Sequence, residues 1–151
     1  MLIAVDPGKV CGYIVVNDDG GVYRQDEASP YETVAVIESL LWGQEHVDVI
    51  VERFIITPQT HKMTRQYDAI ETIGALRYVC MKTPNNSFHL QPRDAKTRVK
   101  NATLKVLGWY MATNDQHAND AAKHAFTAFV NLRPTSEVTR RGLDSLLPPT
   151  E

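Results

Sequence analysis

The chain opens with Leu2-Ile3-Ala4-Val5-Asp6-Pro7-Gly8 and, after a short break, continues with Gly12-Tyr13-Ile14-Val15-Val16. Each stretch is an apolar run bounded by turn residues, which predicts two strands joined as a hairpin. Asp6 falls where the first strand ends, at the rim of a sheet, where a carboxylate stays hydrated and can reach a metal ion. An Asp before Pro-Gly is also an ordinary turn residue, so the positions of the other acids decide between the two interpretations.

Length and composition favour a single domain without a membrane segment. A chain of 151 residues can bury one core. No apolar run approaches the roughly 20 residues that span a bilayer, and Met1 leads directly into a strand without a basic leader, so we expect a cytoplasmic protein. Cys11 and Cys80 form neither a CxxC pair nor a zinc motif, and we expect both to be reduced thiols.

Charge is sorted along the chain. Residues 1–52 carry ten acids and two bases, residues 53–113 carry three acids and ten bases, and residues 114–151 carry five acids and four bases. The net charge of -2 therefore hides a basic middle. A basic segment beside an acidic cluster is what a metal-dependent enzyme acting on a polyanion needs.

The first half of the chain predicts a mixed sheet. A turn at 17–21 leads to a third antiparallel strand at 22–25. Ser29-Pro30-Tyr31-Glu32 predicts a capping box at the start of a helix that ends near Gly43. The β-branched run 47–52 then predicts a fourth strand, parallel to the first, ending in Glu52. Asp6 and Glu52 should therefore meet at one edge of the sheet.

The second half predicts a loop over 54–63, a helix over 64–81, a short fifth strand at 88–90, and one helix from an N-cap at Asp94 to a stop at Gly108. Trp109 is expected in the core. A last helix covers 114–130, and the polar chain beyond Arg133 is expected to be a flexible tail. The fold class is thus α/β, with a five-stranded mixed sheet flanked by helices, a domain at 1–132 and a tail at 133–151.

His117, Asp120 and His124 share one face of the last helix. If this helix packs on the opening strands, its first turns lie over the edge that carries Asp6 and Glu52. Three carboxylates and an imidazole without an obvious matching Lys or Arg form an oxygen-rich site that suits Mg²⁺, or Mn²⁺, better than zinc. Asp115 is an alternative to His117 as the fourth ligand, and His124 is expected on the helix surface.

Two such ions about 4 Å apart can activate a water and stabilise the leaving oxygen in an attack on a phosphodiester. The residues thus point to hydrolysis of nucleic acid. The basic residues of the middle segment are predicted to contact the phosphates of a nucleic acid. They are Lys62, Arg65, Arg93, Lys96, Arg98, Lys100 and Lys105.

Three motifs in this order resemble the RuvC-type Holliday junction resolvases of the ribonuclease H-like superfamily. They are Ile3-Ala4-Val5-Asp6-Pro7-Gly8 with Gly12-Tyr13, then Val49-Ile50-Val51-Glu52, then His117-Ala118-Asn119-Asp120-Ala121-Ala122. The resemblance covers residues 2 to about 130, and the short chain suggests a phage version. It implies a homodimer that makes paired nicks in a four-way DNA junction, with Asp6, Glu52, His117 and Asp120 as catalytic metal ligands. It also implies roles for Phe54 as the aromatic near the crossover, and for Lys96 as the lysine after the fifth strand.

Two other functions fit the same fold. A ribonuclease H that cuts RNA/DNA hybrids would need an essential acid on the first helix, where Glu38 is the central candidate. A member that binds DNA or a partner without cutting is disfavoured, because clustered carboxylates repel one another when no cation lies between them. An actin-like ATPase opens in a similar way but needs two such lobes.

Overall fold

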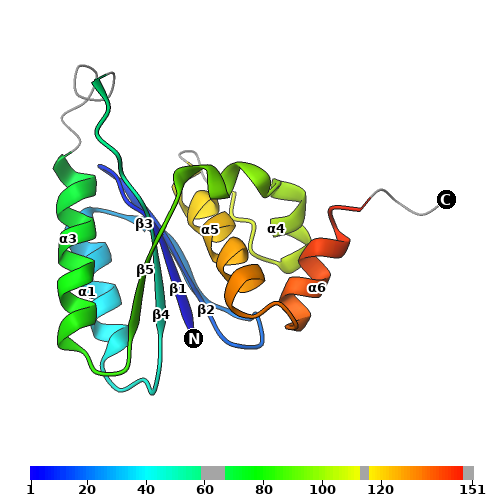
Figure 1. Cartoon of the computed structure of the whole chain (residues 1–151), viewed down its shortest axis with the longest axis horizontal. Helices are drawn as coiled ribbons and strands as arrows, with labels where there is room; N and C mark the ends of the chain where they lie inside the picture. The colour runs from blue at the N-terminus through cyan, green and yellow to red at the C-terminus, as the bar shows by residue number, and fades with distance from the viewer. Residues whose placement is uncertain (59–66, 113–115, 148–151) are drawn as a thin grey trace.

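A five-stranded mixed sheet forms the centre of the molecule (Figure 1). The computed structural model describes residues 1–58, 67–112 and 116–147. The strand order is β3-β2-β1-β4-β5; the first three strands are antiparallel, and β4 and β5 continue the sheet parallel to β1. The strands are β1 (Leu2–Asp6), β2 (Cys11–Val16), β3 (Val22–Ala28), β4 (Asp48–Glu52) and β5 (Ser87–Gln91). The predicted topology is confirmed, although β3 and β5 are longer than expected.

Helices cover both faces of this sheet, so that β1 is buried on each side (Figure 1). One face packs on α1 (Pro30–Leu41) and α3 (Tyr67–Lys82), the other on α5 (His117–Leu132). Alternate residues of β1 point to opposite faces. Ile3 and Val5 belong to the core beneath α1 and α3, whereas Leu2 and Ala4 belong to the core beneath α5. Trp109 is fully buried in the second core, as predicted.

The helix predicted between Asp94 and Gly108 is wrong, because the chain forms two shorter elements there. They are a 3₁₀ helix, η1 (Arg93–Arg98), and α4 (Asn101–Leu107). Val99 and Lys100 between them are extended. Val99 buries its side chain there, so packing outweighs the helical propensity of the segment. Asp94 is not the N-cap expected, because it lies inside η1, which Pro92 precedes. The capping box at Ser29 and the stop at Gly108, which ends α4 with a φ of 75°, are confirmed.

The expectation of a flexible tail does not hold for the residues just after 133. α6 (Glu137–Asp144) packs against α4 and α5, with Val138 and Thr139 almost completely buried. Gly142 lies against the ring of Phe126, closely enough that a Cβ there would meet the ring at 2.1 Å. α6 has only eight residues and few apolar side chains, so its sequence provided little indication of this packing.

None of the described helices combines the length and the apolar character needed to cross a membrane. Cys11 and Cys80 are both free and buried.

Candidate metal and phosphoryl-transfer site

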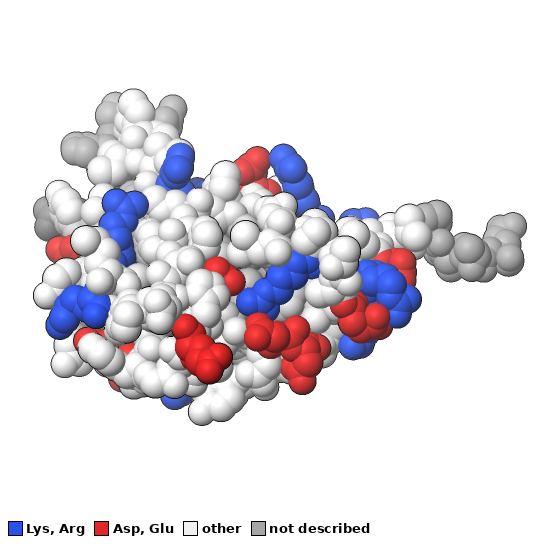
Figure 2. Space-filling view, turned by 60° about the horizontal axis from the view of Figure 1, so that its bottom comes forward, with Lys and Arg blue, Asp and Glu red and all other residues white. Residues whose placement is uncertain are grey.

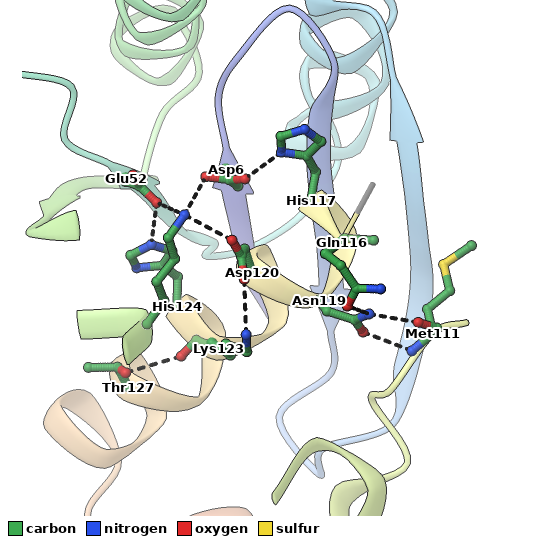
Figure 3. Close-up of polar contacts among 12 residues, drawn as sticks. Asp6, Glu52, Met111, Gln116, His117, Asn119, Asp120, Lys123, His124 and Thr127 are labelled. Carbon is green, nitrogen blue, oxygen red and sulfur yellow. Dashed lines mark hydrogen bonds and ion pairs between the residues drawn. The ribbon is translucent and has the colours of Figure 1, made fainter. Parts of the chain in front are cut away.

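Three carboxylates from three elements meet at one edge of the sheet (Figure 3). Asp6 ends β1 and Glu52 ends the neighbouring parallel strand β4, while Asp120 lies in the first turn of α5. All three surround the ammonium of Lys96. Its Nζ lies 3.3 Å from Asp6 Oδ1, 2.8 Å from Glu52 Oε2 and 3.0 Å from Asp120 Oδ2. The predicted convergence of Asp6, Glu52 and Asp120 is therefore present.

His117 joins the same cluster through Asp6, since its Nδ1 lies 2.8 Å from Asp6 Oδ2. Its position depends on how closely the start of α5 approaches β2. A Cβ at Gly12, the residue paired with Asp6 in the hairpin, would lie 2.0 Å from the carbonyl carbon of His117. Only glycine permits this approach. Glu27 of β3 fixes the same turn, because its Oε1 accepts a hydrogen bond from the backbone N–H of Ala118.

The segment before α5 is held by Asn119, whose side chain is fully buried. Its Oδ1 accepts from the backbone N–H of Met111, and its Nδ2 donates to the Met111 carbonyl (Figure 3). These bonds satisfy polar groups that would otherwise be buried without partners. Asn119 thus fixes where α5 begins, and with it the positions of His117 and Asp120.

His124 does not lie on the helix surface, as expected from the sequence; it is fully buried behind Glu52. Its Nε2 is 2.8 Å from Glu52 Oε2, and its Nδ1 contacts the side-chain amide of Gln91 on β5. Helical spacing placed His124 on the same face as Asp120, but the spacing alone did not reveal what that face packs against. The bonds to Glu52 and Gln91 restrict the Glu52 carboxylate to one orientation.

The expectation that the carboxylates lack a matching base is also wrong. Lys96 is the missing cation, and its side chain is only 15% exposed. Lys96 was predicted as a phosphate contact. Because β5 ends beside Glu52, η1 starts at the same edge of the sheet and places Lys96 within the cluster. Lys123, one turn along α5, also pairs with Asp120 at 3.0 Å. Because Lys96 neutralises the carboxylates, their clustering no longer disfavours a protein that binds DNA or a partner without cutting.

Burial and these pairs set the ionisation of the cluster. Burial alone raises the pKa of Glu52, but hydrogen bonds from His124 and Lys96 outweigh it and lower the pKa to about 2. Burial likewise opposes ionisation of Asp120, whose pKa is nevertheless lowered by Lys96 and Lys123. At Asp6 burial prevails over the attraction of Lys96, so the pKa is raised. Asp6 is thus the carboxylate of the three that takes up a proton most readily.

The donor set fits a hard divalent cation in its chemistry: carboxylate oxygens from Asp6, Glu52 and Asp120, with one imidazole nitrogen. In the structure, the three carboxylates surround the Lys96 ammonium. Within the part of the chain that the structure describes, no group of three or more His, Cys, Asp or Glu side chains is placed to hold a metal directly. Mg²⁺ requires oxygens at about 2.0–2.1 Å, so the Lys96 ammonium must leave before the three carboxylates can share an ion.

Among the predicted DNA contacts, Lys96 lies within this cluster and Arg93 lies beside Glu52. Arg93 and Arg98 are exposed at the two ends of η1, and Lys100 and Lys105 are exposed beyond it. Phe54, two residues after Glu52, is half-buried. Lys62, Arg65 and Asp115 lie outside the described residues. Figure 2 brings forward the end of the molecule that lies at the bottom of Figure 1. On this face, basic and acidic side chains are interspersed and form no continuous basic surface.

Comparison with solved structures identifies a similar fold. The chain is similar to T. thermophilus RuvC in complex with Holliday junction substrate, with a TM-score of 0.62 over 89% of this chain and 96% of that one. The two sequences are 16% identical, so the likeness shows the fold alone. No protein-family model matches the sequence, and no curated protein does. The fold is therefore ribonuclease H-like, as the sequence predicted.

Proposed function

We propose that this protein is a metal-dependent endonuclease that cuts four-way or other branched DNA junctions. The observation that carries the proposal is the meeting of Asp6, Glu52 and Asp120 around a single cationic position. T. thermophilus RuvC, which shares the fold, was solved with a Holliday junction substrate. Paired cuts in a junction need two sites, so we also propose a homodimer.

Asp6, Glu52 and Asp120, with His117 beside Asp6, are the residues that would hold Mg²⁺ or Mn²⁺. When bound, a pair of such ions supplies an activated water and neutralises the leaving oxygen of a phosphodiester. His124 holds Glu52 in one orientation from behind. If a bound ion displaced Lys96 from the carboxylates, its ammonium would remain beside the site on η1 and could pair with a phosphate oxygen of the bound strand.

The exposed basic side chains around η1 support an approach of DNA from that side. Arg93 Nε lies 3.7 Å from Glu52 Oε1, and its side chain is otherwise exposed, so it stands between the cluster and solvent. Together with Arg98, Lys100 and Lys105 it would neutralise phosphates and release counterions. Phe54, two residues after Glu52, is the aromatic that we propose to lie near the crossover of the junction.

The test is cleavage of labelled four-way junction, duplex, flap and RNA/DNA hybrid, each with Mg²⁺ and with EDTA. Native protein should cut the branched DNA substrates in Mg²⁺ alone, and Asp6→Asn should abolish cutting. Asp144→Asn, an exposed acid on α6, is the matched control and should keep native activity. Cleavage that persists in EDTA or in Asp6→Asn would contradict the proposal, and preferential cutting of the hybrid would favour a ribonuclease H.

A second candidate, a DNA-binding protein that does not cut, is favoured by one observation. Lys96 neutralises the carboxylates without any metal, so the same cluster can act as an ion-pair network that only stabilises the fold. Under this candidate the native protein binds the junction, fails to cut it in Mg²⁺ or Mn²⁺, and keeps its junction affinity in Asp6→Asn.

A further inference from the structure

Lys123 is a second cation at the carboxylate cluster, distinct from Lys96. It lies one turn after Asp120 on α5, and its Nζ is 3.0 Å from Asp120 Oδ1 (Figure 3). Its side chain is only 18% exposed, close to the 15% of Lys96. In the part of the chain that the structure describes, Asp120 is the one ion-pair partner of Lys123. Lys123 is therefore held at the cluster by a single contact.

The two oxygens of the Asp120 carboxylate have different partners. Oδ2 lies 3.0 Å from the ammonium of Lys96, as do the nearer oxygens of Asp6 and Glu52 at 3.3 and 2.8 Å. These inner oxygens surround the position that a first divalent ion would take from Lys96. Oδ1 faces Lys123 instead. Asp120 thus has one oxygen toward the shared position and one toward a separate ammonium.

A second ion about 4 Å from the first needs ligands beyond the inner oxygens. Asp6 Oδ2 lies 2.8 Å from Nδ1 of His117, an imidazole that can itself bind a metal. Asp120 Oδ1 lies against an ammonium, which cannot. An ion at about 2.1 Å from that oxygen would lie within about 5 Å of the Lys123 ammonium and would be repelled by it. Lys123 therefore opposes the use of Asp120 Oδ1 as a metal ligand.

The charges of the cluster also limit how many ions it can hold. Three ionised carboxylates contact three bases, which are Lys96, Lys123 and, at 3.7 Å, Arg93. Each divalent ion that takes the place of an ammonium adds one positive charge. A second exchange doubles this excess unless an anion enters with the ion. A phosphate of a nucleic acid supplies one negative charge, together with oxygens that accept from an ammonium.

We propose that Lys123 limits the cluster to one divalent cation until a phosphate of the bound nucleic acid takes its ammonium. The contact between Lys123 and Asp120 joins neighbouring turns of one helix, and such pairs are weak enough for a phosphate oxygen to compete. Lys123 is a positioning residue, since it acts through Asp120. The inference rests on the proposed function for the metal and the nucleic acid, whereas the role of Lys123 is assigned from its contact with Oδ1.

The first test counts the Mn²⁺ ions bound per chain without nucleic acid, by electron paramagnetic resonance. The native protein should bind one ion. Lys123→Met should bind two and show the signal of a coupled Mn²⁺ pair, and Lys123→Gln, which keeps a polar side chain, should do the same. Lys123→Arg keeps a cation beside Asp120 and should bind one. A native protein that binds no ion or two ions overturns the inference, as do neutral variants that bind one.

Lys82→Met is the matched control, because it also removes one ammonium. Lys82 is exposed on α3, which covers the other face of the sheet, and Lys82→Met should bind one ion. Two ions in Lys82→Met would show that the count follows the net charge of the protein and would overturn the assignment to Lys123.

The second test repeats the count with a four-way junction whose phosphates near the crossover are phosphorothioates, which keep their charge and resist hydrolysis. The number of ions bound by the native protein should rise from one to two, and Lys123→Met should bind two with or without the junction. A native protein that binds this junction and still holds one ion overturns the inference.

Cleavage assays separate this inference from the proposed function. If Lys123→Met gains an ion but the native protein cuts no DNA, the proposed nuclease fails and the role of Lys123 stands. If the native protein cuts junctions in Mg²⁺ but binds as many ions as Lys123→Met without DNA, the inference fails and the nuclease stands.

Discussion

Replacing Lys96 by methionine should destabilise the protein in the absence of a divalent cation and increase its affinity for one. The ammonium contacts three carboxylates at 2.8–3.3 Å, and it is almost buried. Each contact is worth about 5 kcal/mol at an effective dielectric constant near 20, before the cost of dehydrating the charges. Measured losses on removing one partner of a buried ion pair are about 3–5 kcal/mol. Protonation of Asp6 relieves part of the repulsion, so we expect about 3 kcal/mol at neutral pH.

For a chain of this length, such a loss lowers the midpoint of thermal unfolding by about 6–12 °C. Mg²⁺ should then restore much of the stability of Lys96→Met, because the ion no longer competes with the ammonium. A free ion concentration about 100 times the dissociation constant contributes about 2.7 kcal/mol. The assay is thermal unfolding followed by circular dichroism, with and without Mg²⁺, beside calorimetric titration of Mn²⁺ into native and variant protein.

Lys100→Met is the matched control, since Lys100 is exposed next to η1 and should change neither the midpoint nor the response to Mg²⁺. Two results would contradict this prediction: Lys96→Met unfolds at the native temperature, or Mg²⁺ raises the unfolding midpoints of the native protein and Lys96→Met by the same amount. Either result would mean that Lys96 and the ion do not share one position.

Three further predictions concern the same edge of the sheet. The pKa of Glu52 is about 2 in the folded protein, against an ordinary 4.5, so the ionised carboxylate contributes stability on the order of 3 kcal/mol above pH 4.5. This stability is lost as the pH falls toward 2. Acid unfolding curves should therefore show a smaller loss of stability across this pH range in Glu52→Gln than in the native protein. Gly12→Ala should cost about 1–3 kcal/mol in urea unfolding and impair cleavage, because the new methyl meets the backbone of His117. Gly74→Ala, whose methyl would meet no heavy atom within 4 Å, should be neutral or stabilising in the same assay. Glu38→Gln should leave junction cleavage near the native rate, and a loss as large as that of Asp6→Asn would instead indicate hybrid cleavage.

The sheet was predictable because its signals are local. β1 and β4 are continuous apolar runs that each end in an acid, and the parallel pairing of adjacent strands brings those acids to one edge. The capping box at Ser29 and the stop at Gly108 are likewise written in a few neighbouring residues. Together with the helical spacing of the last helix, these patterns predict that Asp6, Glu52 and Asp120 meet at one edge of the sheet.

The parts that sequence reasoning missed depend on contacts between distant segments. Lys96 lies 90 residues from Asp6, and whether it faces the cluster or solvent depends on η1 being a 3₁₀ helix rather than the first turn of a longer α-helix. His124 has the spacing of a surface residue on a polar face, yet β4 and β5 cover that face. Neither residue type nor periodicity reports which side of a helix a neighbouring strand occupies.

A crystal of the protein soaked in Mn²⁺ would show directly, by anomalous scattering, whether the three carboxylates bind a divalent cation. We expect a peak bounded by the carboxylates of Asp6, Glu52 and Asp120, with the Lys96 ammonium displaced from its contacts with them. A map without a peak there at saturating Mn²⁺, in which Lys96 still bridges the three carboxylates, would contradict a metal-dependent nuclease and leave a structural ion-pair network in its place.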